Sequence, residues 1–420
     1  MILSLFWGPL MRFDKYDLSP EIQANLQEIG FHRTTDIQFK TIPAILDGED
    51  VLAIAQTGTG KTAAFAIPII EAVSQRKRQS GHRGIQSLVL VPTRELAKQI
   101  GQVFARISRN TKATSYAIYG GVDQDPQIRQ LLGGVDILIA TPGRMFDLIH
   151  QQFIDVSRVQ TLVLDEADHM LDLGFIGDIQ SIKRKLEQRH QTLFFSATIN
   201  PKIKKMAYSQ IRSNALRIQV SPEKMVSKNI KHSLVKVEMD DKRHLLVNIL
   251  KGEPDGKYMV FARTQVRVER VLKHLAKNDI QAFSIHGGME QDEREGNLDA
   301  YRHQKSGVMV ATDVSARGID LPGITFVINY DLPDDPEYYV HRIGRTGRGF
   351  EKGEALSFYS PEENEKLDQI QEFLNIKIPL LKADKEALEQ PVEIDLEDIS
   401  FADMIAEEES KVKRRKKRRK

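Results

Sequence analysis

Short, continuous runs of β-branched and aliphatic residues recur along this chain and alternate with stretches of helical periodicity. Such runs lack the polar–apolar alternation of half-exposed strands and are typical of strands covered on both faces in a parallel sheet. The pattern therefore predicts an α/β fold with helices on both faces of mostly parallel sheets. The runs lie at 51–55, 87–91, 136–140, 161–165, 192–196, 258–262, 282–286, 308–312 and 325–329.

The runs form two groups, separated by a polar stretch that contains Pro222. A chain of 420 residues also exceeds the size of one ordinary hydrophobic core, so two α/β domains are expected. The predicted segments are an N-terminal extension at 1–10, a first domain at 11–214, a linker at 215–228, a second domain at 229–375, an acidic segment at 376–410 and a basic tail at 411–420.

Composition restricts the class of protein. The chain has no cysteine, which excludes disulfides and thiolate metal sites and favours a reducing, cytoplasmic location. No stretch approaches the roughly 18 apolar residues that a membrane span needs, so no membrane association is expected. The apolar start, MILSLFWGPLM, lacks a basic region and a cleavage site, and Met11 is an equally good start.

Charge is segregated at the C-terminal end, although the whole chain carries a net charge of only +2. Residues 384–409 are strongly acidic, and 411–420, KVKRRKKRRK, are almost entirely basic. Blocks of like charge this dense are typical of disordered tails that bind polyanions. A nuclear-targeting signal is the other interpretation of the basic tail, and the sequence does not separate the two.

A phosphate-binding loop follows the first apolar run directly. The segment AQTGTGKT departs from the usual pattern only at Ala55, and Gly58 and Gly60 still allow backbone N–H groups to converge on phosphate oxygens at a helix N-terminus. Lys61 is expected to reach the β and γ phosphates, and Thr62 to ligate Mg²⁺. The predicted ATP-binding loop comprises Ala55, Gln56, Thr57, Gly58, Thr59, Gly60, Lys61 and Thr62.

An acidic tetrad, DEAD, follows the run at 161–165, at the strand end where open α/β sheets bind ligands. Asp165 is the predicted Mg²⁺-side carboxylate, and Glu166 is the predicted base that positions and deprotonates the attacking water. Acidic residues at a helix N-terminus for dipole reasons are the structural alternative.

Motifs in a fixed order give a resemblance to a known family. They are GFHRTTDIQ, AQTGTGKT, PTRELAKQ, GG, TPGR, DEAD, SAT, VFART, HGGMEQDER, ATDVSARGID and HRIGRTGR, over roughly residues 13–360. The sequence resembles the DEAD-box ATP-dependent RNA helicases, in particular the bacterial RhlE type. The resemblance implies two tandem RecA-like domains and ATP and Mg²⁺ as ligands.

The resemblance also implies roles for single residues around ATP. Gln38 is expected to read the adenine edge, with Phe31 and Phe13 packed against the base. The segment before it departs from the family pattern, with Thr34 where proline is usual. Residues expected to couple the nucleotide site to RNA are Ser196, Ala197, Thr198, Asp168 and His341.

RNA contacts are implied at loops that follow apolar runs in both domains. Small residues there let backbone amides approach a sugar-phosphate chain, and arginines add charge, so little sequence specificity is expected. In the first domain these residues are Pro92, Thr93, Arg94, Gly120, Gly121, Thr141 and Arg144. In the second domain they are Arg263, Thr264, Gly287, Gln291, Arg294, Thr312, Asp313 and Arg317.

The segment HRIGRTGRG places arginines three residues apart, and by itself it would indicate a solvated basic face. Because the second domain has no phosphate-binding loop, we expect it to close on the first domain and bring Arg345 and Arg348 to the γ-phosphate. Asp320 is expected at the ribose. Arg342 is left to structure or to a contact between domains.

The function predicted is ATP-dependent, local and non-processive unwinding of RNA duplexes or remodelling of RNA–protein complexes, with ribosomal or RNA-decay particles as candidate partners. Two alternatives stay open. One is an ATP-gated RNA clamp with little unwinding, and the other is a DNA-directed motor of the same superfamily.

Overall fold

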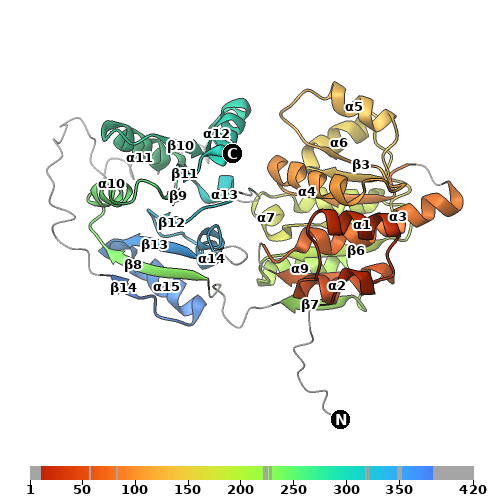
Figure 1. Ribbon diagram of the computed structural model, residues 1–420, viewed down its shortest axis with the longest axis horizontal. Coiled ribbons are helices and arrows are strands. Elements are labelled where there is room, and N and C mark those ends of the chain that lie inside the picture. Colours follow the sequence, from red (N-terminus) through yellow and green to blue (C-terminus); the bar gives the residue numbers. More distant parts are fainter. Residues whose placement is uncertain are drawn as a thin grey trace, which may run out of the picture. The chain divides into compact units, whose positions relative to one another are not determined.

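Two compact units make up the chain, with the main boundary after residue 228. The computed structural model describes residues 11–55, 58–81, 84–220, 226, 229–316, 319, 321–347 and 352–381, and each unit is described here by itself (Figure 1). Each unit contains one seven-stranded sheet in which every strand pair described is parallel. The predicted fold of two tandem RecA-like α/β domains is confirmed.

The first domain orders its strands β3-β4-β2-β5-β6-β1-β7. The strands are β1 (Val51–Ala55), β2 (Ser87–Leu90), β3 (Ser115–Ile118), β4 (Ile137–Ala140), β5 (Thr161–Leu164), β6 (Gln191–Ser196) and β7 (Leu216–Val220). The helices are α1 (Pro20–Glu28), α2 (Asp36–Leu46), α3 (Lys61–Ser80), α4 (Arg94–Ile107), α5 (Asp125–Leu132), α6 (Pro142–His150), α7 (Ala167–Asp172), α8 (Ile176–Lys185) and α9 (Pro201–Gln210), after a short 3-10 turn at Phe13–Lys15.

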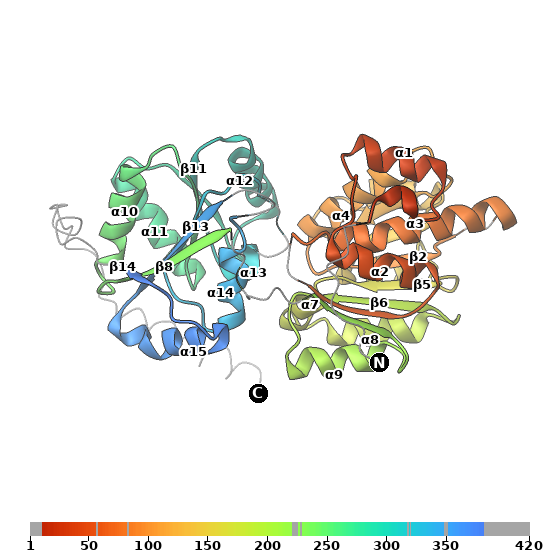
Figure 2. The same ribbon diagram turned by 60° about the horizontal axis from the view of Figure 1, so that its bottom comes forward.

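Alternate residues of the central strand β1 point into two separate cores. Val51 and Ala53 pack with apolar residues of α1 to α4, whereas Leu52 and Ile54 pack with residues of α6 to α9. Figure 2 shows α1 to α4 on one face of this sheet and α8 and α9 on the other. Coverage on both faces explains why these strands read as continuous apolar runs.

The second domain repeats the arrangement with the order β10-β11-β9-β12-β13-β8-β14. Its strands are β8 (Ile230–Lys236), β9 (Lys257–Phe261), β10 (Ala282–Ile285), β11 (Gly307–Ala311), β12 (Phe326–Asn329), β13 (Gly353–Tyr359) and β14 (Leu380–Leu381). Its helices are α10 (Lys242–Gly252), α11 (Gln265–Lys277), α12 (Gln291–His303), α13 (Asp313–Ala316), α14 (Pro336–Ile343) and α15 (Asn364–Leu374), with a 3-10 turn η2 at Pro361–Glu363.

Two predicted boundaries require correction. The range expected to be the linker, 215–228, begins with β7, which pairs with β1 and so belongs to the first sheet. The range expected to be the acidic segment, 376–410, begins with residues of the second domain. Ile378 is buried in its core, and β14 pairs with β8. Both strands lie at sheet edges, where a strand is short and lacks the continuous apolar pattern.

The predicted extension at 1–10 and the basic tail at 411–420 lie outside the described residues. Within the part of the chain that the structure describes, no helix is both long enough and apolar enough to span a bilayer.

Candidate active site and nucleic-acid interface

The predicted phosphate-binding loop connects β1 to α3. Gly58 and Gly60 have φ values of +81° and +91°, a region that favours glycine. A Cβ atom at Gly60 would also lie only 2.5 Å from Nε2 of Gln38. The loop therefore needs glycine at this position for both its backbone conformation and its close packing, and Lys61 follows as the first residue of α3. Gln56 and Thr57 lie outside the described residues.

Lys61 is an orphaned buried cation at the start of α3. Its side chain is buried, and its Nζ has no hydrogen-bond partner among the described residues. A buried ammonium group costs free energy unless a charged or hydrogen-bonding group compensates it. The N-terminus of α3 also presents backbone N–H groups that lack partners within the helix. The residues present thus fit a phosphate group, which would supply the compensating negative charge.

Asp165, at the end of β5, is fully buried beside Lys61. Burial, together with the charges of Glu166 and Asp168, raises the pKa of Asp165 to about 6, although the charge of Lys61 opposes the shift. The protein alone therefore leaves this carboxylate short of positive charge. Mg²⁺ is usually bound by one or two carboxylates together with substrate phosphate oxygens, so Asp165 and the Thr62 hydroxyl are suitable donors for it.

Asp165→Asn is expected to stabilise the nucleotide-free protein at pH 8. The folded carboxyl has a pKa of about 6, above its unfolded value, so the folded state binds more protons between these values and stability falls as pH rises through that window. The amide avoids this loss, which amounts to up to about 3 kcal/mol. Urea unfolding in a chelator should show the difference at pH 8 and little difference near pH 4. An equal difference at both pH values would contradict the assignment.

Glu166 is the N-cap residue directly before α7 and has a left-handed backbone, φ +50° and ψ 50°. This conformation is unfavourable for a residue with a side chain, and it persists where the surrounding structure enforces it, as at many active sites. The side chain is largely buried, and its Oε2 lies 3.5 Å from Nδ1 of the buried His169. A carboxylate fixed in this way beside Asp165 suits the orientation of one water molecule.

Asp168 connects the tetrad to the segment Ser196–Ala197–Thr198 at the end of β6. Its Oδ2 accepts hydrogen bonds from the backbone N–H groups of Ala197 and Thr198 and from the Thr198 hydroxyl, each at 3.2 Å. Ser196 is fully buried, and its Oγ lies 3.4 Å from the Thr198 nitrogen. The structure thus brings four of the five predicted coupling residues together, and their coupling role stays a prediction.

Gln38 contacts the phosphate-binding loop itself. Its Nε2 donates to the Gly60 carbonyl at 3.1 Å, and its Oε1 accepts from the Thr35 backbone at 2.9 Å. Both ends of the amide are therefore engaged within the domain, and its contact with adenine stays a prediction. Phe13 and Phe31 stack on each other, with ring centroids 6.4 Å apart, and their contact with the base also stays a prediction.

Thr34, where the family pattern has proline, has a structural use. Its backbone N–H and its hydroxyl both donate to the Met11 carbonyl, at 2.9 and 3.1 Å. Proline has neither donor. Thr34 therefore holds the start of the described chain against the Gln38 segment.

The predicted RNA contacts of the first domain follow β3, β4 and β2, which are neighbours in the sheet. Their carboxyl ends therefore lie along one edge. Two arginines pack against the loop at Gly120–Gly121. Arg144 donates to the Val122 carbonyl at 2.8 Å, and the Arg94 guanidinium lies so close to Gly121 that a Cβ atom there would be 1.7 Å from it. Thr93 caps α4 by accepting from Leu96. Pro92 and Thr141 follow β2 and β4.

The second domain repeats this placement on β10, β11 and β9. Arg263 and Thr264 follow β9, Gly287 follows β10, and Thr312 and Asp313 follow β11. On α12, Arg294 donates to the Ser315 carbonyl at 3.0 Å, and Gln291 donates to Glu295 at 2.8 Å. The equivalent strand ends thus carry the predicted RNA residues in both domains.

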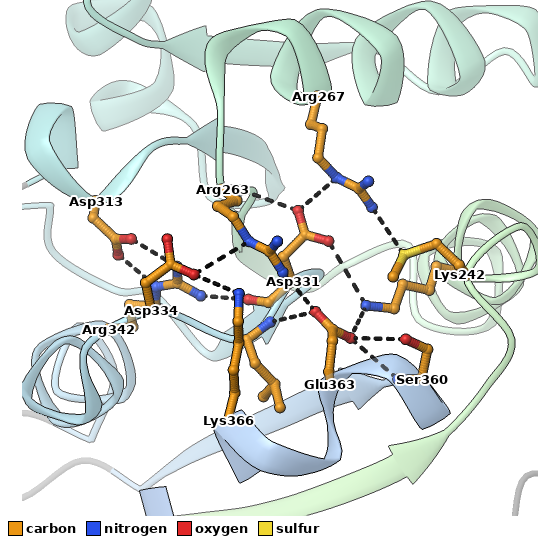
Figure 3. A network of polar contacts seen from close by, with 12 residues as sticks. Lys242, Arg263, Arg267, Asp313, Asp331, Asp334, Arg342, Ser360, Glu363 and Lys366 are labelled. Atoms are coloured by element: carbon orange, nitrogen blue, oxygen red, sulfur yellow. Dashed lines mark hydrogen bonds and ion pairs between the residues drawn. The ribbon is translucent and has the colours of Figure 1, made fainter. Parts of the chain in front are cut away.

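Arg342 is held inside the second domain (Figure 3). It is fully buried, and its Nε and Nη2 lie 2.5 and 2.7 Å from the two carboxylate oxygens of Asp313. Its Nη1 donates to the Asn329 side chain and to the Asp331 carbonyl. These contacts give Arg342 a structural role, which is one of the two roles that the sequence leaves open for it. They also engage both carboxylate oxygens of Asp313. The RNA contact predicted for Asp313 stays a prediction.

Several predicted residues lie outside the described part of the chain. His341 and Arg345 are described, on and just after α14, and Arg345 is buried. The residues that fall outside are Gln56, Thr57, Arg317, Asp320 and Arg348.

Sequence reasoning missed residues that support the predicted ones. His169 lies one helical turn after Glu166, so its spacing was a usable signal. Lys242, Asp331 and Glu363 form a buried ion network beneath Arg263, and they come from separate segments with no common motif.

Comparison with known proteins agrees with this geometry. The family model for the DEAD/DEAH box helicase matches residues 35–206, and that for the helicase conserved C-terminal domain matches 241–349. The chain is 39% identical over 374 residues to the ATP-dependent RNA helicase CshA of Listeria monocytogenes, covering 89% of this chain and 71% of the relative. It is 38% identical over 387 residues to CshA of Bacillus subtilis, covering 92% and 77%.

Solved structures give the same result. Dbp5 of S. cerevisiae bound to RNA and ADP BeF3 has a TM-score of 0.79 and 29% identity, covering 90% of this chain and 100% of that one. Mss116p bound to ssRNA and AMP-PNP has a TM-score of 0.80 and 27% identity, covering 91% and 84%. Because these relatives do not include an RhlE protein, that part of the resemblance stays a prediction. The chain belongs to the DEAD-box ATP-dependent RNA helicases.

Proposed function

We propose that RNA binding to both domains makes ATP hydrolysis at the first domain productive, and that the enzyme opens short RNA duplexes locally without moving along them. The observation that carries this proposal is the buried Lys61, whose ammonium group has no hydrogen-bond partner among the described residues, beside the buried Asp165, whose pKa is raised. The first domain holds these groups, and the second domain has no phosphate-binding loop of its own.

The nucleotide and its Mg²⁺ would bind to the charged and hydrogen-bonding groups of the first domain that have no compensating partner among the described residues. Lys61 and the first N–H groups of α3 would take its phosphates, and Thr62 and Asp165 would hold Mg²⁺, which would neutralise phosphate charge. Glu166 then has two tasks of its own: it orients a water molecule by accepting its hydrogen bond, and it accepts a proton at a carboxylate oxygen. His169, 3.5 Å from that carboxylate, restricts its rotation.

RNA would lie along the strand ends that carry the Gly120–Gly121 loop in the first domain and Arg263 and Gly287 in the second. Dbp5 and Mss116p, the structural relatives, are described as bound to RNA. Backbone amides and arginines in these loops suit phosphate and 2′-hydroxyl groups rather than base edges. The contacts would therefore depend little on RNA sequence.

Domain closure would complete the site. Arg345 and Arg348 would approach the γ-phosphate, and Asp320 the ribose, only when both domains hold the same RNA. Positive charge at the transferred phosphoryl group is a large part of catalysis in related reactions. A strand bent by closure cannot stay in an A-form duplex, so a few base pairs would open in each cycle.

ATP hydrolysis is expected to rise strongly with single-stranded RNA and little with DNA of the same sequence, because the proposed contacts include the 2′-hydroxyl. Strand separation is expected for short RNA duplexes and to fail for duplexes of several helical turns. The measurement is steady-state hydrolysis together with a duplex-length series. Equal stimulation by DNA would favour a DNA-directed motor. Efficient unwinding of long duplexes would contradict local opening.

A further inference from the structure

Two buried carboxylates lie beneath the loop that follows β9 in the second domain (Figure 3). The side chains of Asp331 and Glu363 are 1% and 3% exposed, and the ammonium group of Lys242, which is fully buried, lies 3.7 and 2.5 Å from them. Buried charges of this kind are costly unless they are paired and hydrogen-bonded. Their partners therefore indicate what the network is built to hold.

Asp331 fixes the backbone of this loop. Its Oδ2 accepts a hydrogen bond from the Arg263 N–H at 3.0 Å and forms an ion pair with Arg267 Nε at 2.7 Å. Burial alone would raise the pKa of Asp331, but Arg267 and Lys242 outweigh it and hold that pKa below its usual value. Asp331 is therefore charged and keeps the start of the loop in one place.

Glu363 holds the side chain of Arg263. Its Oε1 accepts from Arg263 Nη2 at 2.9 Å, and its Oε2 accepts from Lys242 Nζ at 2.5 Å and from the Ser360 backbone at 3.1 Å. Oε1 also lies 3.4 Å from the Leu332 nitrogen. With partners on both oxygens, the carboxylate has little freedom to rotate.

Arg263 differs from the other members because it reaches the surface. Its side chain is 31% exposed, compared with 13% for Arg267 and 0% for Lys242. Arg263 Nε also lies 3.8 Å from the exposed Asp334, which pairs with Lys366 as well. Four cations therefore face three carboxylates, an excess of one positive charge. That excess lies at the end of β9, the strand end at which RNA is proposed to bind.

We propose that Glu363 is a positioning residue that presents the Arg263 guanidinium to a phosphate group of bound RNA. The inference rests on the proposed function. Glu363 lies beyond the matched helicase domain, which ends at residue 349, and it acts through Arg263 rather than on RNA. An arginine side chain loses about 2 kcal/mol of rotamer entropy when it is immobilised, so one already held in place binds phosphate more tightly.

The test is a double-mutant cycle on the full chain. Hydrolysis is measured against the concentration of a single-stranded oligoribonucleotide for wild type, Glu363→Gln, Arg263→Ala and the double variant. The matched control is Glu362→Gln, the same change at the exposed neighbouring position. Thermal unfolding of each variant reports on the fold.

Arg263→Ala is expected to raise the half-saturating RNA concentration about tenfold, the factor for a contact worth roughly 1.4 kcal/mol. Glu363→Gln is expected to raise it about three- to tenfold, with little change in kcat at saturating RNA or in the KM for ATP. The double variant should be no weaker than Arg263→Ala alone, because Glu363 then has nothing to position. Glu362→Gln should behave as wild type.

Additive effects in the double variant would overturn the inference, as would an unchanged half-saturating RNA concentration in either single variant. Loss of RNA stimulation in the wild type would instead overturn the proposed function, so the two failures are distinguishable. If Glu363→Gln does not fold, the variant Lys242→Met/Glu363→Gln takes its place in the cycle. This variant removes one buried charge of each sign and leaves no buried charge of the pair without its partner.

Discussion

Glu166→Gln is expected to lower the kcat of RNA-stimulated ATP hydrolysis by about 10²- to 10⁴-fold, the range for loss of a general base. The amide has nearly the same shape as the carboxylate but cannot accept a proton. It also retains the left-handed backbone at this position, because the fold rather than the charge enforces that conformation. Single-turnover hydrolysis with pre-bound ATP and saturating RNA measures the chemical step directly.

Nucleotide binding separates this result from simple damage to the site. Glu166→Gln should bind ATP with nearly wild-type affinity, since the residues proposed to hold the phosphates are unchanged. Glu187→Gln, an identical change at an exposed position of the same domain, is the control for loss of a charge. A variant that hydrolyses ATP at the wild-type rate would show that another group is the base. A variant that unwinds duplexes without turnover would indicate an ATP-gated clamp.

Nine strands could be predicted from the sequence, whereas β3, β7, β8, β13 and β14 could not. Every continuous apolar run that was predicted became a strand, because helices on both faces require apolar residues at each position. The strands that were missed carry polar or half-buried residues, as in β3 with Ser115 and Tyr116. Such segments do not differ from loops until the neighbouring strand is in place.

The nucleotide site was predictable for a related reason. Its phosphate-binding loop and acidic tetrad are local sequences whose spacing follows from one strand, one turn and one helix. The network around Arg263 was not predictable, since Lys242, Asp331 and Glu363 come from separate elements that only the sheet brings together. Sequence spacing carries no information about contacts of that kind.

The arginines of HRIGRTGRG show the same limit within one short segment. Arg342 and Arg345 are the same residue type three positions apart, and of the two only Arg345 is predicted to approach the γ-phosphate. In the structure, Arg342 binds the end of β11 through Asp313 and the end of β12 through Asn329 and the Asp331 carbonyl. Removing Arg342 would leave the buried groups of Asn329 and Asp331 and the largely buried Asp313 carboxylate without their partner.

Arg345→Ala and Arg342→Ala are expected to fail in different ways. Arg345→Ala should keep more of its stability than Arg342→Ala and lose RNA-stimulated hydrolysis by about 10³- to 10⁵-fold, as when an arginine that stabilises transition-state charge is removed. Arg342→Ala should lower the free energy of unfolding of the second domain by about 3–5 kcal/mol, the cost of breaking a buried ion pair. Urea unfolding and kcat at saturating RNA and ATP, measured on both variants, separate the two.

Arg189→Ala, a change at an exposed arginine of the first domain, should alter neither quantity. Asp313→Asn tests the same ion pair from its other side and should destabilise the second domain, since Arg342 would then lack its carboxylate. If Arg345→Ala unfolds as readily as Arg342→Ala, the whole arginine run has a structural role and the charge proposed for the γ-phosphate must come from elsewhere. If Arg342→Ala keeps its stability and loses only hydrolysis, the buried pair with Asp313 contributes little to folding and belongs to the catalytic machinery.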